Sequence, residues 1–175
     1  MSRKRCFSKN KARGLEGVFI FNHKLYNKIM NKIIIREAPL EDVIKINATV
    51  PEFDPALGKD YFAERIAGKK SLAIVAHLEG RPAGYLVGYD KFEDGSFYCW
   101  MAAVDPAYRR QGVLKALMDY QNDWARKEGF NKIKIKTRNN RRSMLGYLVK
   151  AGFLFTQVIP WEKTEDNRIE LEKNL

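Results

Sequence analysis

The stretch Val104–Leu117, VDPAYRRQGVLKAL, joins the end of an apolar strand to a basic turn and the start of an amphipathic helix. Asp105-Pro106 ends the strand, and Gly112 opens the helix. The first amides of a helix have no intrahelical acceptor and lie at the positive end of the helix dipole, so they can bind a phosphate group. A glycine at this position lets the phosphate approach the backbone closely. The stretch therefore predicts an anion site at the carboxyl end of a strand.

Two arginines, Arg109 and Arg110, stand at the entrance of this turn. A guanidinium group can pair with phosphate oxygens through two parallel hydrogen bonds, while the main chain supplies the inner contacts. Together these features favour a diphosphate ligand. A simpler interpretation stays open at this point, in which Pro106 ends a strand, a basic turn faces solvent and Gly112 relieves crowding.

A wider pattern around the turn resembles the signature of the GNAT superfamily of acyl-CoA-dependent N-acetyltransferases. That signature joins a strand ending in V-x-P to Y-R-x-x-G-x-(G or A) and then to a helix. The matching residues of this chain are Val104, Pro106, Tyr108, Arg109 and Gly112. Two positions depart from the signature: Leu114 replaces the small third residue, and Arg110 stands where glycine is common. Backbone amides are present whatever the side chain, proline excepted, so we expect the site to be intact.

The resemblance implies an α/β (α+β) domain over roughly residues 33 to 175, with a mixed, mostly antiparallel central sheet of about six to seven strands flanked by about four helices. It also implies acetyl-CoA as the co-substrate. In the family, the strand before the motif splays from its neighbour near a bulge, and its free backbone groups bind the pantetheine arm. The cofactor-binding residues that the resemblance implies are Ala102, Ala103, Val104, Arg109, Arg110, Gln111, Gly112, Val113, Leu114 and Asn140.

A second part of the resemblance lies in the last predicted helix. The family often shows Asn, then Tyr seven residues later, then Gly-Phe at the end of the helix; here Asn140 and Tyr147 are seven residues apart. Counting back from Gly152-Phe153 instead places Leu148 in the tyrosine position. A phenol near the sulfur can donate a proton to the departing coenzyme A thiolate, so Tyr147 is the candidate general acid. The other interpretation is a helix tyrosine that packs its ring and leaves its hydroxyl in water.

The sequence does not single out a general base. A carboxylate with a raised pKa, or one acting through water, could take the proton of the attacking amine. Four acids lie in suitable loops, although each also fits the pattern of a solvated loop charge: Glu52, Asp54, Glu93 and Asp94. We therefore assign no residue to this role.

The composition supports a single domain, because 175 residues that are 45% hydrophobic and 12% aromatic can build one sizeable core and are too few for two ordinary domains. The formal net charge of +11 suggests a nucleic-acid ligand until it is located along the chain. Residues 1–32 hold nine of the 32 basic residues and one of the 21 acids, which leaves a net charge of +3 for residues 33–175. Nucleic-acid binding by this nearly balanced domain is not expected.

Residues 1–32 are predicted to form a basic N-terminal extension. Their apolar patch, Val18–Phe21, is too short for a signal-peptide core or a membrane span, so no membrane anchor is expected. Four interpretations stay open: a poorly ordered basic tail, a polyanion-binding arm, an organelle transit peptide, or residues upstream of a natural start at Met30. The tail and the Met30 start are favoured, because the segment is poor in serine and lacks the aromatic context of nucleic-acid arms. We expect protein from the native source to have the mass of a chain initiated at Met30.

The cysteines and histidines predict neither a disulfide nor a metal site. Cys6 lies in the basic extension and Cys99 in a predicted buried strand, so a structural disulfide is not expected and a reducing cytoplasm fits. His23 and His77 are distant from each other and from any acid cluster, so we assign no metal. Strand alternation puts Tyr98 and Cys99 on opposite faces, and a buried cysteine is inert packing rather than a covalent nucleophile.

Hydrophobic periodicity and turn residues predict the other elements. The predicted strands are 33–37, 71–78, 83–89, 97–104, 132–137, 155–161 and 168–172. The predicted helices begin at Pro39, near Tyr61, at Gly112 and after a cap at Asn139 or Asn140, and the last three end near Gly68, Gly129 and Gly152. The strand 132–137 follows a helix, so it should lie parallel to the strand 97–104, and its alternation of Lys and Ile indicates one buried face.

These observations predict an N-acetyltransferase that transfers an acetyl group from acetyl-CoA to a primary amine by direct attack. The acceptor is a small-molecule or peptide amine whose identity the sequence does not reveal, and a homodimer is possible. The alternative is a non-catalytic acyl-CoA-binding or regulatory module with the same fold. A third class is a polyanion-binding protein that works through the basic extension, in which case removing residues 1–29 should abolish binding.

Overall fold

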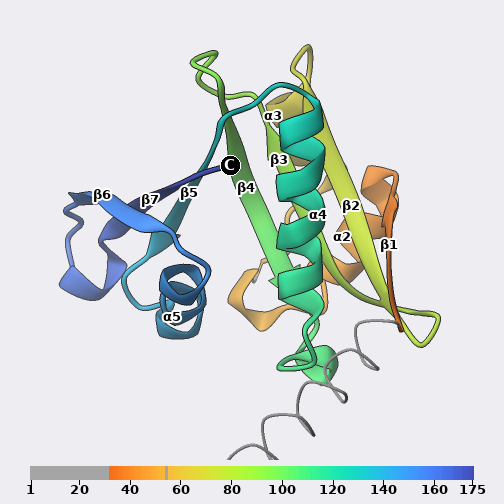
Figure 1. Cartoon of the computed structure of the whole chain (residues 1–175). Helices are drawn as coiled ribbons and strands as arrows, with labels where there is room; N and C mark the ends of the chain where they lie inside the picture. The colour runs from red at the N-terminus through yellow and green to blue at the C-terminus, as the bar shows by residue number, and fades with distance from the viewer. Residues whose placement is uncertain (1–31, 54) are drawn as a thin grey trace, which may run out of the picture.

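A seven-stranded sheet with strand order β1-β2-β3-β4-β5-β7-β6 organises the chain, as the computed structural model shows for residues 32–53 and 55–175 (Figure 1). The strands are β1 (Ile33–Glu37), β2 (Ser71–Leu78), β3 (Arg81–Tyr89), β4 (Ser96–Val104), β5 (Lys132–Arg138), β6 (Leu154–Ile159) and β7 (Arg168–Asn174). The helices are α2 (Leu40–Asn47), α3 (Lys59–Ile66), α4 (Val113–Lys127) and α5 (Arg142–Lys150), with short 3₁₀ turns η1 (Pro51–Phe53), η2 (Pro106–Tyr108) and η3 (Thr164–Asp166). The predicted basic extension, residues 1–32, lies outside the described residues apart from Lys32.

The sheet is mixed and mostly antiparallel, which confirms the predicted fold class. Every neighbouring pair is antiparallel except β4 and β5, which run parallel as predicted. A parallel pair needs a crossover connection, and α4 supplies it. The start of α4 therefore lies at the carboxyl end of β4.

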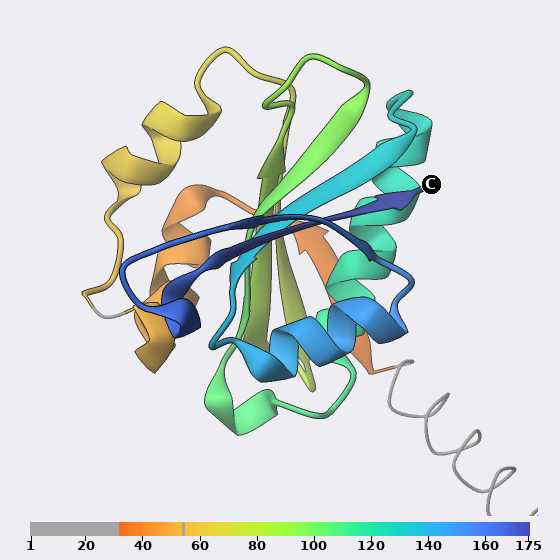
Figure 2. The same ribbon diagram turned by 90° about the vertical axis from the view of Figure 1, so that its left-hand side faces the viewer.

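Helices cover both faces of the sheet. Figure 2 shows α2 and α3 on one side and α4 and α5 on the other. The main core lies under α4 and α5, where Leu117 and Leu148 pack with Ile133 and Leu171. A second core lies under α2 and α3. Both faces of the central strands are therefore buried.

The strand β5, KIKIKTR, has the predicted single buried face. Ile133 and Ile135 belong to the main core, while the lysines that alternate with them lie on the opposite face. Each of those lysines pairs with an acid: Lys132 with Glu172, Lys134 with Asp94, and Lys136 with Glu170. The lysines are therefore held by neighbouring elements rather than left in solvent.

Two predicted strand ends are corrected by the structure. The strand β3 begins at Arg81 rather than at residue 83, because Glu79 and Gly80 both adopt positive φ (53° and 81°) and close a two-residue turn. At the other end of the domain, β6 stops at Ile159 rather than at Trp161. Pro160 follows it without an amide hydrogen, and the Trp161 amide donates to Asn167 Oδ1 at 2.8 Å instead of extending the ladder.

The predicted asparagine cap of α5 is wrong. The N-cap position is Arg141, which makes no side-chain capping bond. Asn139 Nδ2 donates to the Thr164 carbonyl and Asn140 Nδ2 donates to Asp166 Oδ1, both at 3.1 Å. Both asparagines thus hold the turn η3, which is distant in sequence and invisible to a local capping pattern.

Candidate functional site

The strands β4 and β5 separate halfway along their length. They pair only where Ser96–Cys99 faces Lys132–Ile135, and β4 then continues to Val104 without β5 beside it. The separation begins at a bulge, because Val87 pairs with Met101 and Gly88 with Cys99, which leaves Trp100 as the extra residue. The bulge and the splay that the resemblance implied are both present (Figure 1). Strand edges that part in this way expose backbone groups to a ligand.

The predicted pantetheine-binding residues lie on the separated part of β4. Ala102, Ala103 and Val104 still pair with β3 on one side, and no β5 residue faces them on the other. Ala103 is buried against α2 and α3, and its two neighbours are half-buried. The Val104 carbonyl accepts a hydrogen bond from Arg109 Nε at 3.2 Å, which ties the turn back to the strand.

The turn that follows β4 has the backbone geometry of an anion site. Asp105 Oδ1 accepts from the Ala107 amide at 2.9 Å and shapes η2. Gly112 has φ 84°, and the first intrahelical bond of α4 runs from the Ala116 amide to the Gly112 carbonyl at 3.0 Å. The amides of Val113 and Leu114 precede that bond, so the helix itself offers them no acceptor. These backbone donors fit a phosphate group.

The two departures from the family signature have structural explanations. Arg110 has φ 62°, a left-handed conformation that costs a non-glycine residue roughly 1–2 kcal/mol, which explains why glycine is common there. Leu114 is half-buried and packs against the main core, so its side chain is directed into the protein while its amide stays at the helix start. Neither side chain replaces a backbone donor.

Gly84 on β3, which the sequence did not single out, lets α4 begin close to the sheet. A Cβ at this position would lie 2.8 Å from the Ala103 carbonyl oxygen and 2.9 Å from Val113 Cγ1. Both distances are shorter than van der Waals contact. The start of α4 and the carboxyl end of β4 therefore pack so closely on residue 84 that only glycine fits there.

Three loops meet at the mouth of the splay, through contacts that the sequence did not predict. Arg109 Nη1 and Nη2 donate to Glu52 Oε1 and Oε2 at 3.0 and 2.8 Å, a bidentate ion pair between the β4–α4 turn and η1. Arg141, just before α5, donates to the Glu52 carbonyl at 3.0 Å. The three residues are far apart in sequence, so no local pattern links them. We call this group the Glu52 bridge.

The ion pair also decides what Glu52 can do chemically. The hydrogen bonds from Arg109 hold the pKa of Glu52 below its usual range, which makes this carboxylate a weak proton acceptor. Asp94, another candidate, is bound by Lys134 and Ser96, which lower its pKa to about 2. Glu93 is exposed in the β3–β4 turn, and Asp54 lies outside the described residues.

Tyr147 and Leu148, the two candidates for the tyrosine position of the family, differ in burial on α5. Leu148 is fully buried in the main core, whereas Tyr147 is half-buried and packs against that core from its edge. Only Tyr147 carries a hydroxyl. Asn140, which is predicted to contact the cofactor, is exposed. Its side chain binds Asp166 in η3, and its backbone amide donates to the Glu165 carbonyl at 2.8 Å.

Cys99 and Tyr98 lie on opposite faces of β4, as predicted. Cys99 is buried in the main core, and burial raises the pKa of its thiol to about 12, so it is an inert packing residue. Tyr98 lies on the α3 face and contacts the rings of Tyr89 and Phe92. Within the described part of the chain, no three His, Cys, Asp or Glu side chains gather in a way that could hold a metal ion.

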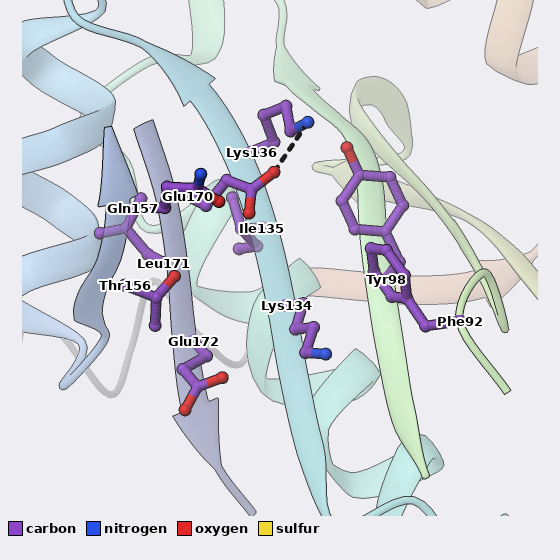
Figure 3. Close-up of a pocket in the computed structure, with 10 residues that line it drawn as sticks. All are labelled: Phe92, Tyr98, Lys134, Ile135, Lys136, Thr156, Gln157, Glu170, Leu171 and Glu172. Atoms are coloured by element: carbon purple, nitrogen blue, oxygen red, sulfur yellow. Dashed lines mark ion pairs between the residues drawn. The ribbon is translucent and has the colours of Figure 1, made fainter. Parts of the chain in front are cut away.

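A cavity of about 300 Å³ opens on the face of the sheet opposite α4 (Figure 3). Its lining comes from β4, β5, β6, β7 and the β3–β4 turn: Phe92, Tyr98, Lys134, Ile135, Lys136, Thr156, Gln157, Glu170, Leu171 and Glu172. Two of the lining residues, Lys136 and Glu170, form an ion pair 2.7 Å long. Tyr98 is the residue of β4 in this lining, and it lies in the part of β4 that pairs with β5, next to the point where the two strands separate.

Comparisons with known proteins agree with this arrangement. The family model described as the acetyltransferase (GNAT) family matches residues 40–153. Among solved structures, the chain is similar to the ribosomal-protein-S18-alanine N-acetyltransferase of Escherichia coli, with TM-score 0.69 and 19% identity over 81% of this chain and 93% of that one. A comparison with curated protein sequences finds no match.

Two further similar structures were determined with the expected co-substrate or its product. The yncA protein of Salmonella typhimurium, in complex with acetyl-CoA, has TM-score 0.65 and 17% identity over 82% of this chain and 94% of that one. A Bacillus subtilis acetyltransferase in complex with CoA has TM-score 0.64 and 17% identity over 82% and 98%.

The splayed parallel pair, the helix that starts at the carboxyl end of β4 and the match to the family model together define the class of protein, an acetyltransferase. Because the family model covers more than half of its length, the chain belongs to the GNAT acetyltransferase family. None of the helices that the structure describes has the length and apolar character needed to cross a bilayer.

Proposed function

We propose that this protein transfers the acetyl group of acetyl-CoA to a primary amine by direct attack. The observation that carries the proposal is the combination of the splay after Cys99 with the helix start at Val113, where backbone groups of one strand and one helix converge. In this proposal the amides of residues 111–114 bind the diphosphate, with Arg109 and Arg110 beside it, and Ala102–Val104 bind the pantetheine arm.

The proposed chemistry needs no covalent enzyme intermediate. The amine nitrogen bonds to the thioester carbonyl carbon, the carbon–sulfur bond breaks, and the sulfur leaves as a thiolate that takes a proton from the Tyr147 hydroxyl. The amine attacks in its neutral form, its nitrogen then loses one proton to water, and the Tyr147 phenolate takes a proton back from water, which restores the enzyme. The burial of Cys99 supports direct attack, because a buried thiol with a raised pKa is a poor nucleophile.

The proposal is tested by release of free thiol from acetyl-CoA in the presence of a panel of primary amines. We expect steady thiol formation that requires both components. Tight binding of acetyl-CoA without turnover on any amine would support the alternative, a non-catalytic acyl-CoA-binding module. A cytoplasmic location and association into a homodimer stay predictions.

A further inference from the structure

The face of the sheet under α3 carries an aromatic floor that leads from the cavity to the splay. Tyr98 and Tyr89 contact each other at a ring-centroid distance of 5.8 Å, and Trp100 lies 6.0 Å from Tyr89 and 5.6 Å from Tyr61. Trp100 is half-buried and is the bulge residue at which β4 and β5 part. A molecule on this floor would therefore have one end at the splay.

Three cations stand over this floor. Lys91 Nζ lies 4.6 Å from the centroid of the Tyr98 ring, and Lys69 Nζ lies 4.8 Å from that of Tyr89. Arg65 Cζ lies 5.2 Å from the Tyr61 ring and 5.8 Å from the Trp100 ring. All three cationic residues are exposed, so a ligand can reach them.

None of these three cations forms an ion pair with an acid among the described residues, although Glu170 attracts Lys91 from a longer distance. The contacts of Arg65, Lys69 and Lys91 are with rings, a tyrosine hydroxyl and a backbone carbonyl. The two cations that line the cavity, Lys134 and Lys136, are by contrast paired with Asp94 and Glu170. The side of the aromatic floor nearest α3 thus carries three positive charges that form no ion pair. The two lysines of the cavity beside it are each paired with an acid.

The cations Lys136, Arg65 and Lys69 act on Lys91 through their like charge. Burial and the neighbouring cations Lys136, Arg65 and Lys69 together lower the pKa of Lys91, and Glu170 opposes the shift only in part. A group of like charges held close together costs free energy, which a bound anion relieves.

These cations are not placed to bind the phosphates of coenzyme A. Lys69 precedes β2 and Lys91 follows β3, so both lie at the amino end of β4, whereas the anion-binding turn lies at its carboxyl end (Figure 1). The two positive regions therefore lie at opposite ends of one strand.

We propose that the acceptor is a primary amine that carries its own anionic group, a carboxylate or a phosphate, and that Arg65, Lys69 and Lys91 bind this group while the amine reaches the splay. The inference rests on the proposed function. Tyr98, which Lys91 covers, is two residues before Trp100, a separation of about 7 Å along a strand. The anion and the amine should be separated by a similar length.

The test compares pairs of amines that differ in charge, using the full chain with saturating acetyl-CoA. The pairs are 5-aminopentanoate with its amide and 3-aminopropyl phosphate with 3-aminopropanol, because in both anionic amines five bonds separate the nitrogen from the carboxylate carbon or the phosphorus. Because hydrogen bonds to charged groups are the stronger ones, we expect kcat/KM to be at least about tenfold higher for the anionic member of a pair. The carboxylate and phosphate pairs tell the two anions apart.

Arg65→Gln and Lys91→Gln should each raise KM for the anionic amines about tenfold and leave the neutral amines unchanged. Arg65→Glu should reverse the preference. Lys150→Gln, at the end of α5 on the other face of the sheet, is the matched control and should change nothing. Equal kcat/KM within every pair, or equal losses for both members, would overturn the inference.

The failure of this inference is distinguishable from failure of the proposed function. Turnover of neutral amines without an anionic preference would leave the acetyltransferase proposal standing and remove only the anion site. If no amine is acetylated, calorimetric titration with the same pairs in the presence of CoA still tests the anion site. Binding heat from the anionic amines that is lost in Arg65→Gln supports the site. Equal binding heats within each pair, or no heat from any amine, refute it.

Discussion

Glu52 competes for the guanidinium group of Arg109 with the phosphate that Arg109 is predicted to bind. Both terminal nitrogens of the guanidinium already donate to the carboxylate, so Arg109 has to leave Glu52 before it can form a bidentate pair with a phosphate. An exposed ion pair of this kind contributes about 1 kcal/mol or less. We therefore expect Glu52→Gln to bind CoA more tightly, by up to about fivefold, in a calorimetric titration.

The control for this change is Glu41→Gln, which breaks another surface ion pair, with Lys59, away from the splay. It should leave the dissociation constant for CoA unchanged. Weaker CoA binding by Glu52→Gln would mean that Arg109 acts only as a brace between loops, and that the phosphates contact the backbone without it.

The proposed role of Tyr147 depends on its hydroxyl group alone. If its hydroxyl protonates the thiolate, Tyr147→Phe should lower kcat by about tenfold or more while the dissociation constant for acetyl-CoA stays the same. Tyr120→Phe is the matched control, because Tyr120 is a half-buried tyrosine on the neighbouring helix α4 that also packs against the main core. An unchanged kcat for Tyr147→Phe would leave packing as its only role.

At the scale of elements, the backbone of the turn between β4 and α4 is the part of the candidate site that could be predicted from the sequence, since β4 ends at Val104 and α4 starts at Val113. All of its groups belong to one contiguous stretch, and most are backbone groups whose direction follows from where a strand ends and a helix begins. The parallel pairing of β5 and its single buried face were predictable for the same reason, because Lys and Ile alternate within seven residues.

Elements that depend on distant partners were predicted poorly. Asn139 and Asn140 look like helix caps in sequence, but both bind η3, some 25 residues later. The Glu52 bridge joins three loops, and the cations over the aromatic floor come from α3 and from two strand ends. No local pattern records such contacts, since only the order of strands in the sheet brings these segments together.

The positive φ of Gly112 allows a sharp test of the turn as an element. Gly112→Asp should abolish measurable CoA binding, because its carboxylate would face the phosphates at contact distance. The left-handed backbone should cost this variant only about 1 kcal/mol of stability, so it should stay folded. Gly129→Asp is the matched control: Gly129 has φ 88° just after the other end of α4 and open space around it, so the variant carries a similar backbone cost and should bind CoA like the parent. Retained CoA binding in Gly112→Asp would move the phosphates elsewhere.

For the whole molecule, ligand binding should appear as resistance to unfolding. The proposed ligand site spans β3, β4, α4 and the loops of the Glu52 bridge. A ligand that binds only when all of these elements are in place would stabilise the folded state as a unit. At a concentration 100 times the dissociation constant, that stabilisation is about 2.7 kcal/mol. For a domain of this size it should raise Tm by roughly 5–10 °C.

The same measurement separates the two halves of the predicted cofactor site. S-acetylpantetheine carries the thioester and the arm that the splayed part of β4 is predicted to bind, but it lacks the diphosphate. It should raise Tm much less than acetyl-CoA at equal concentration, because the amides at the start of α4 then have no anion to bind. An equal rise with both ligands would place the binding energy in the splay alone, and the helix start would then be a structural turn rather than an anion site.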